Sequence, residues 1–178
     1  MHKLSRRDFL QRLSALTAAG LLPASIGRAL ALPAQVRSGT LADMEHVVIL
    51  MQENRAFDHY FGTLRGVRGF DDPRPLRLRD GAPVWQQRQD GGAPVLPFHL
   101  DTRATSAAVM KSLDHNWKGA RGQDAARWQQ YDCWVPYKGA LSMGHLQRAD
   151  IPFYHALADA FTVCDGYFCS LHGPTNPN

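Results

Sequence analysis

The pattern of hydrophobic and polar positions predicts a protein in which short buried strands alternate with helices. Residues 46–51 form a continuous apolar run rich in β-branched side chains. Such a run predicts a strand buried on both faces, as in a parallel sheet covered by helices. Residues 161–164 form a second short run of the same kind. The fold class predicted from this pattern is α/β.

Two helices are predicted from spacing together with start and stop signals. The first covers residues 56–61 and is closed by Gly62. The second covers residues 150–158, with Asp150 as a plausible cap and Pro152 in its first turn.

The remaining segments are less regular. Residues 105–113 and 124–131 have helical spacing. Residues 63–103 are rich in Gly, Pro, Arg and Asp, which predicts a long excursion of turns with a hairpin. A connection of this length is usually functional or an insertion.

The first 31 residues predict a signal for export. A basic start is followed by an apolar run at residues 13–22, which is too short to span a bilayer, so no transmembrane segment is predicted. Small residues then form a signal-peptidase pattern that ends at Ala31. Arg6 and Arg7 resemble a twin-arginine signal, which implies the twin-arginine translocation machinery as a partner and a periplasmic or secreted protein. The alternative is a basic amphipathic helix that packs or lies on a membrane.

The excess of basic residues lies only at the N-terminal end of the chain. The sequence has 178 residues, 44% of them hydrophobic and 20% charged, which is typical of a globular protein. The net charge of +4 comes entirely from residues 1–31, and residues 32–178 carry equal numbers of acidic and basic side chains. A basic surface for nucleic acid is therefore not predicted.

The cysteines leave two alternatives open. Cys133, Cys164 and Cys169 make an odd number, so at most one pair can form a disulfide. An oxidising periplasm would permit such a bridge, and buried free thiols are the other interpretation. The spacing of the last two cysteines matches no zinc site.

Polar side chains follow the predicted strand 46–51 directly. Ligands of α/β proteins bind at the carboxyl ends of buried parallel strands, and Glu53 and Asn54 lie at this point. A carboxylate there needs a partner, and a hard divalent cation suits two adjacent oxygen-bearing side chains. The alternative is an ordinary helix start, with Asn54 as its cap and Glu53 in solvent.

Thr175 is the second candidate for chemistry. Asn176 and Pro177 predict the first turn of a helix, where free N–H groups and the helix dipole favour a phosphate. A threonine hydroxyl needs a base or a metal to act as a nucleophile, so Thr175 and Glu53 fit one mechanism if a single ion contacts both. A helix cap is the alternative role of Thr175.

His115 is the candidate acid or base. It lies between Asp114 and Trp117 in a polar, aromatic turn, and an imidazole there can donate to a phosphoryl oxygen or protonate a leaving alkoxide. A structural histidine is the alternative. The weaker candidates among the other histidines are His59, His145, His155 and His172.

One block of sequence carries a family resemblance. Residues 53–62, ENRAFDHYFG, resemble the signature of the bacterial phosphoesterase family that contains phospholipases C and a group of acid phosphatases, with Ala56 where the usual form has Ser. The resemblance covers nearly all of the chain after the predicted signal. It continues, in order, through residues 114–117, 143–145, 150–154, 157–165 and 173–178.

The resemblance implies an alkaline-phosphatase-like three-layer α/β/α sandwich with one divalent metal ion. It implies that Glu53 and Asn54 are metal ligands, that Thr175 is both ligand and nucleophile, and that His115 lies near the phosphoryl group. The other ligands of the family lie far downstream. Residues 32–178 are therefore expected to be the N-terminal part of a truncated catalytic domain, with an incomplete sandwich.

The subgroup is indicated by residues 114–117 and 171–175, which resemble the phosphocholine-preferring phospholipases C. This resemblance implies a phospholipid substrate at a membrane surface. Phosphatidylcholine or sphingomyelin would be hydrolysed to phosphocholine and diacylglycerol or ceramide. Trp117, Trp134 and Tyr137 are candidates for an aromatic cage around the choline ammonium. The alternatives are an acid phosphatase of the same fold and an inactive fragment that lacks the downstream ligands.

Overall fold

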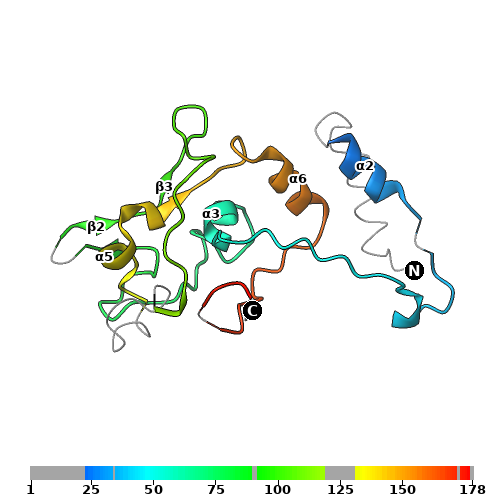
Figure 1. Cartoon of the computed structure of the whole chain (residues 1–178), viewed down its shortest axis with the longest axis horizontal. Coiled ribbons are helices and arrows are strands. Elements are labelled where there is room, and N and C mark those ends of the chain that lie inside the picture. The colour runs from blue at the N-terminus through cyan, green and yellow to red at the C-terminus, as the bar shows by residue number, and fades with distance from the viewer. Residues whose placement is uncertain (1–22, 34, 90–91, 119–130, 172, 177–178) are drawn as a thin grey trace. The chain divides into compact units, whose positions relative to one another are not determined.

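The computed structural model describes residues 23–33, 35–89, 92–118, 131–171 and 173–176 (Figure 1). The chain divides into two compact units, one of Met1–Met51 with Pro152–Thr162 and one of Gln52–Ile151 with Val163–Asn178. The described elements are α2 (Ala24–Ala31), a 3₁₀ turn (Leu41–Asp43), α3 (Phe57–Phe61), β1 (Gln87–Arg88), β2 (Pro94–Val95), β3 (Phe98–His99), α5 (Trp134–Lys138), a second 3₁₀ turn (Ala140–Met143), β4 (Gly144–His145) and α6 (Pro152–Ala160). This mixture of helices and small sheets is compatible with an α/β protein.

Helices α2 and α6 form the packed part of the first unit. The side chain of Ile26 on α2 is only 3% exposed and packs against Ala156 and Ala160 of α6. Helix α6 confirms the helix predicted for residues 150–158. No helix within the described residues is long and apolar enough to cross a membrane.

The predicted strand at residues 46–51 is wrong for this structure. The segment is extended, but it pairs with no strand in the described part of the chain, and Val48 and Ile49 are 90% and 77% exposed. Residues 161–164 are likewise outside any strand, and Phe161 is 46% exposed. A parallel strand is stable only between neighbours that satisfy its N–H and C=O groups, and a local apolar run cannot supply those neighbours.

The second unit holds two small sheets. Strands β1 and β2 pair antiparallel, which confirms a hairpin within residues 63–103. Strands β3 and β4 pair parallel, with Phe98 opposite Gly144 and His99 opposite His145. The core beside the parallel pair consists of Leu100, Ala107 and Leu146, with Tyr60, Met110 and Ile151 packed against it.

Helix α3 confirms the prediction for residues 56–61, and Gly62 follows it for a steric reason. The φ angle of Gly62 is −57°, so the residue does not need the left-handed conformation. A Cβ at this position would lie 2.5 Å from Cε2 of Phe70 and 2.6 Å from the Asp58 carbonyl oxygen. Glycine is therefore required by the close approach of the residue 70 ring.

Residues 105–113 form turns, so the helix predicted there is wrong. The Asp101 carbonyl accepts hydrogen bonds from both the N–H and the hydroxyl of Thr105, at 2.8 and 2.7 Å. The Asp101 carboxylate also accepts the N–H of Arg103. These local side-chain bonds satisfy the backbone without a helix. The helix predicted at residues 124–131 lies mostly outside the described residues.

Asp150 does more than precede α6. Its carboxylate accepts hydrogen bonds from Nε2 of His99 at 2.7 Å, from both the N–H and the hydroxyl of Thr102 at 2.9 and 3.0 Å, and from the N–H of Gln147 at 2.8 Å. Burial raises the pKa of this carboxyl, but the hydrogen bonds outweigh burial and hold the pKa well below its ordinary value. Asp150 thus joins the turn after β4 to the turn after β3. The sequence had suggested only a helix cap for this residue.

Candidate functional site

His59 fixes helix α3 to strand β4. Its Nδ1–H donates to the carbonyl of Gly144 at 2.8 Å, and its own carbonyl accepts the N–H of Leu146 at 2.8 Å. Burial lowers the pKa of the ring and outweighs the hydrogen bond to Gly144, which raises it, and the charge of Arg55 lowers it further. The residue therefore holds the helix in place, which is a structural role for a histidine that the sequence gave as a weak catalytic candidate.

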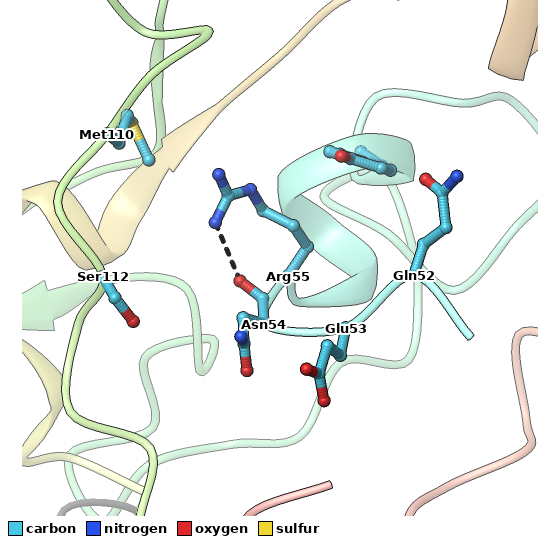
Figure 2. A pocket seen from close by; sticks show the side chains of 7 residues that line it. Gln52, Glu53, Asn54, Arg55, Met110 and Ser112 are labelled. Atoms are coloured by element: carbon cyan, nitrogen blue, oxygen red, sulfur yellow. Dashed lines mark hydrogen bonds between the residues drawn. The ribbon is translucent and has the colours of Figure 1, made fainter.

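The turn before α3 carries the two predicted metal ligands. Asn54 has a φ angle of +64°, a left-handed conformation that asparagine tolerates better than most residues. Nη1 of Arg55 donates to the Asn54 carbonyl at 2.9 Å. The side chains of Glu53 and Asn54 extend in the same direction from this turn (Figure 2). A left-handed residue other than glycine often marks a functional site, since its strain persists only where the surroundings impose it.

An open pocket of about 390 Å³ lies beside this turn. One wall is the turn itself, and the facing side chains come from the segment that carries Met110 and Ser112 (Figure 2). Tyr60 and Met110 line the pocket and also pack on the core of the unit. The complete lining among the described residues is Gln52, Glu53, Asn54, Arg55, Tyr60, Met110 and Ser112. The sequence missed the last three, because nothing local relates residue 60 or 110 to residue 53.

The donor set of the pocket fits a hard cation in kind. Glu53, Asn54 and Ser112 supply oxygen atoms, which Mg²⁺ and Ca²⁺ prefer. Over the described ranges, no three His, Cys, Asp or Glu side chains gather in a way that could hold a metal ion. A hard cation takes roughly six or more oxygen ligands. The pocket can therefore provide part of a coordination shell, with Glu53 as its one carboxylate.

Asp58 is a half-buried acid three residues after Arg55, which lines the pocket. Its Oδ1 atom is buried and has no hydrogen-bond partner among the described residues. Burial raises the pKa of this carboxyl. Asp58 occupies the first turn of α3, where the helix dipole favours a negative charge.

His115 is exposed and held by its own turn. Its Nδ1–H donates to the carbonyl of Leu113 at 2.9 Å, which leaves Nε2 as the atom that can accept or return a proton. The carboxylate of Asp114 accepts the N–H of Asn116 at 3.1 Å, so the turn is locally stabilised. His115 does not line the described part of the pocket, although Ser112 does.

Trp117 brings the histidine turn next to the threonine loop. A Cβ on Gly173 would lie 3.8 Å from Cε3 of Trp117, so the loop passes close to the indole. Thr175 lies two residues further along and is half-buried. Thr175 is not among the described residues that line the pocket, so the structure does not bring it to Glu53 and Asn54. The segment 110–117 nevertheless connects the pocket at one end to the loop of Gly173 at the other.

Helix α5 is a further part of this region that the sequence did not predict. Gln87 is 1% exposed, and its amide donates to the carbonyls of Val84 and Tyr131 at 2.6 and 2.8 Å. Its Oε1 accepts the N–H of Trp134 at 3.3 Å. One buried amide therefore fixes the start of α5 relative to β1. Pro136 lies in the first turn of the helix, where a missing N–H is tolerated.

None of Cys133, Cys164 and Cys169 forms a disulfide in the structure. The last two are exposed, whereas the sequence suggested that free thiols would be buried. His155 and His145 are buried, which is consistent with structural roles. His172 lies outside the described residues.

Comparison with known proteins gives a consistent result. The model described as the Phosphoesterase family matches residues 44–178. The chain is 51% identical, over all of its length, to the non-hemolytic phospholipase C of Burkholderia pseudomallei. It is 49% identical over 99% of its length to the hemolytic phospholipase C of Pseudomonas aeruginosa. It is 39% identical over 98% of its length to phospholipase C B of Mycobacterium tuberculosis.

The relatives are much longer than this chain. It spans 26% of the Burkholderia protein, 24% of the Pseudomonas protein and 36% of the Mycobacterium protein.

Proposed function

The chain belongs to the phosphoesterase family, and from this premise we propose that the full-length protein is a phospholipase C. The proposed substrate is a choline phospholipid at a membrane surface, phosphatidylcholine or sphingomyelin. The products are phosphocholine and diacylglycerol or ceramide. The observation that carries the proposal is the pair Glu53 and Asn54, presented side by side at a left-handed turn of an open pocket, in a chain whose relatives are named phospholipase C.

We propose Glu53, Asn54 and Thr175 as ligands of one divalent metal ion, in an alkaline-phosphatase-like α/β/α sandwich of the full-length protein. Bound there, the ion would supply positive charge that favours the alkoxide form of the threonine and neutralises charge on the phosphoryl oxygens. The oxygen-rich lining of the pocket supports the choice of a hard cation.

The proposed reaction has two steps, and residues of this chain act in both. The oxygen of Thr175, which has first released its proton to solvent, attacks the phosphorus, and the bond from phosphorus to the glycerol or ceramide oxygen breaks. His115, protonated at Nε2, gives its proton to the leaving oxygen. Water then attacks the phosphothreonine ester, His115 takes the proton of that water, and phosphocholine leaves from Thr175. The hydrogen bond from Nδ1–H of His115 to Leu113 supports this use of Nε2.

We further propose that the protein is exported by the twin-arginine machinery and acts in the periplasm or outside the cell. Arg6 and Arg7, and the confinement of the net positive charge to residues 1–31, support this localisation. Replacing both Arg6 and Arg7 by lysine should leave the protein in the cytoplasm. Cell fractionation measures this, and export unchanged by the replacement would contradict the proposal.

The test of the enzymatic proposal is the release of phosphocholine from phosphatidylcholine vesicles by the full-length protein. A phosphomonoester serves as a second substrate, and Thr175→Ala and Thr102→Ala are compared as matched variants. We expect lipid hydrolysis that falls by at least about a thousandfold in Thr175→Ala and persists in Thr102→Ala. Activity on the monoester alone would make the protein a phosphatase of the same family. Lipid hydrolysis that survives in Thr175→Ala would contradict the nucleophile.

A further inference from the structure

Lys138 lies at the end of α5 with its charge over an aromatic ring. Its Nζ is 4.8 Å from the centroid of the Trp134 ring. The side chain is half-buried, and burial lowers the pKa of its ammonium, while the charge of Asp114 acts in the opposite direction. The tryptophan face and a nearby carboxylate thus hold a cation where water is partly excluded, which strengthens a cation–π contact.

The carboxylate reaches this place from a different segment. The hydroxyl of Tyr137 donates to Oδ2 of Asp114 at 3.5 Å, a long hydrogen bond that nevertheless joins α5 to the turn of residues 114–117. The other oxygen of Asp114 accepts the N–H of Asn116. Because Gln87 fixes the start of α5, the indole, the phenol and the carboxylate are supported from three parts of the chain.

We propose that the Trp134 ring and the Asp114 carboxylate form a subsite for the positively charged group of the substrate headgroup, which Lys138 occupies in the absence of substrate. The proposal rests on the phosphodiesterase function proposed above and adds the residues that select a cationic headgroup. Asp114 is two residues from Ser112 of the pocket, within about 7 Å along the chain. One short segment of chain therefore carries both a residue of the pocket and the carboxylate of the proposed subsite.

A quaternary ammonium suits this subsite better than the lysine does. The lysine ammonium is compact and strongly hydrated, and it has three donors that need acceptors. A quaternary ammonium has no N–H group, so placing it on an aromatic face leaves no donor unsatisfied. The long stem of Lys138 can move its ammonium to solvent when the ligand arrives.

The experiment compares two synthetic p-nitrophenyl phosphodiesters with the full-length protein. One carries choline, and the other carries 3,3-dimethylbutanol, which has the same shape without the charge. We expect kcat/KM to favour the choline diester by about tenfold, the factor that corresponds to about 1.4 kcal/mol of cation–π interaction. In Trp134→Leu this ratio should fall toward one. In Lys138→Met, which removes the competing cation, the ratio should rise several-fold through a lower KM for the choline diester.

The control is Trp85→Leu, because Trp85 packs edge-on against Phe70 and is not part of the proposed subsite. It should leave the ratio of the two substrates unchanged. If Trp134→Leu lowers both substrates equally, Trp134 is a packing residue and the proposal is overturned. If the wild type hydrolyses both diesters equally well, the phosphodiesterase function stands and the subsite is rejected.

Binding of tetramethylammonium, measured by calorimetry, separates the two proposals. The wild type should bind this probe, Lys138→Met should bind it several-fold more tightly, and Trp134→Leu should not bind it. This pattern without hydrolysis of either diester would support the subsite and refute the proposed function. Equal binding by the wild type and Trp134→Leu would overturn the subsite whatever the activity.

Discussion

At the residue scale, two side chains with no proposed chemistry, the half-buried His59 and the buried Gln87, set the geometry of the region. His59 holds α3 to β4, and Gln87 holds the start of α5. Neither role could be predicted from the sequence, because their partners Gly144 and Tyr131 are 85 and 44 residues away. Glu53 and Asn54, by contrast, were predictable as a pair, since two adjacent polar residues after an apolar run are a local signal.

The first prediction concerns the hydrogen bond from His59 to Gly144. His59→Phe keeps a ring of similar size but removes the donor, which leaves the Gly144 carbonyl unpaired. We expect the free energy of unfolding to fall by about 1–3 kcal/mol. Urea denaturation of the full-length protein measures this. The exposed His115→Phe variant is the matched control and should change stability by less than about 0.5 kcal/mol. Equal effects of the two variants would contradict the role assigned to His59.

The second prediction concerns pH. Burial lowers the pKa of His145, and the charges of His99 and His59 lower it further, while Asp150 acts in the opposite direction. Because the folded-state pKa is below the ordinary value of about 6.5, the unfolded chain binds protons first as pH falls. The stabilising contribution of the neutral ring is complete above about pH 6.5 and is lost progressively as pH falls through that value toward the folded-state pKa.

His145→Phe should therefore reduce the loss of stability between about pH 7.5 and pH 5.5. The measurement is the urea midpoint of the full-length protein at the two pH values. Asp150 does not interfere, because its lowered pKa moves its own loss of stability below about pH 4. An identical pH dependence in the wild type and in His145→Phe would show that this ring does not titrate differently in the folded state.

At the scale of elements, helices were predictable where local signals define both ends. Helices α3 and α6 have such signals and are found as predicted. The helix at residues 105–113 fails because threonine, serine and aspartate side chains form local hydrogen bonds instead. The strands at residues 46–51 and 161–164 fail for a different reason: a strand depends on partners that the run itself does not encode.

The third prediction concerns the segment 46–51 in the chain of 178 residues. Its amides lack strand partners in the described structure, so they should exchange with solvent at rates close to those of an unfolded peptide. The amides of Leu100 and Leu146, which are hydrogen-bonded to His145 and His59, should exchange more slowly. Hydrogen exchange with mass spectrometry measures both. Protection of 46–51 equal to that of Leu100 would show that the run is paired.

At the scale of the whole molecule, the sequence predicted the family and the pocket residues 53 and 54, but not the way the blocks meet. Met110 and Ser112 complete the pocket, and Trp117 lies close to the loop that carries Thr175. These are contacts between distant parts of the chain, which periodicity and spacing do not report. Thr175 and His115 stay proposals for the full-length protein, since this chain spans about a quarter of the length of two of the relatives it matches.

The central claim is that Thr175 forms a covalent ester with the phosphoryl group. The most direct measurement is mass spectrometry of the full-length protein after acid quenching during turnover of the choline p-nitrophenyl diester. The account predicts a phosphocholine ester on the peptide that contains Thr175, absent from the Thr175→Ala variant and from protein quenched before substrate is added. Rapid turnover with no modified Thr175 peptide, or an adduct on another residue, would contradict it.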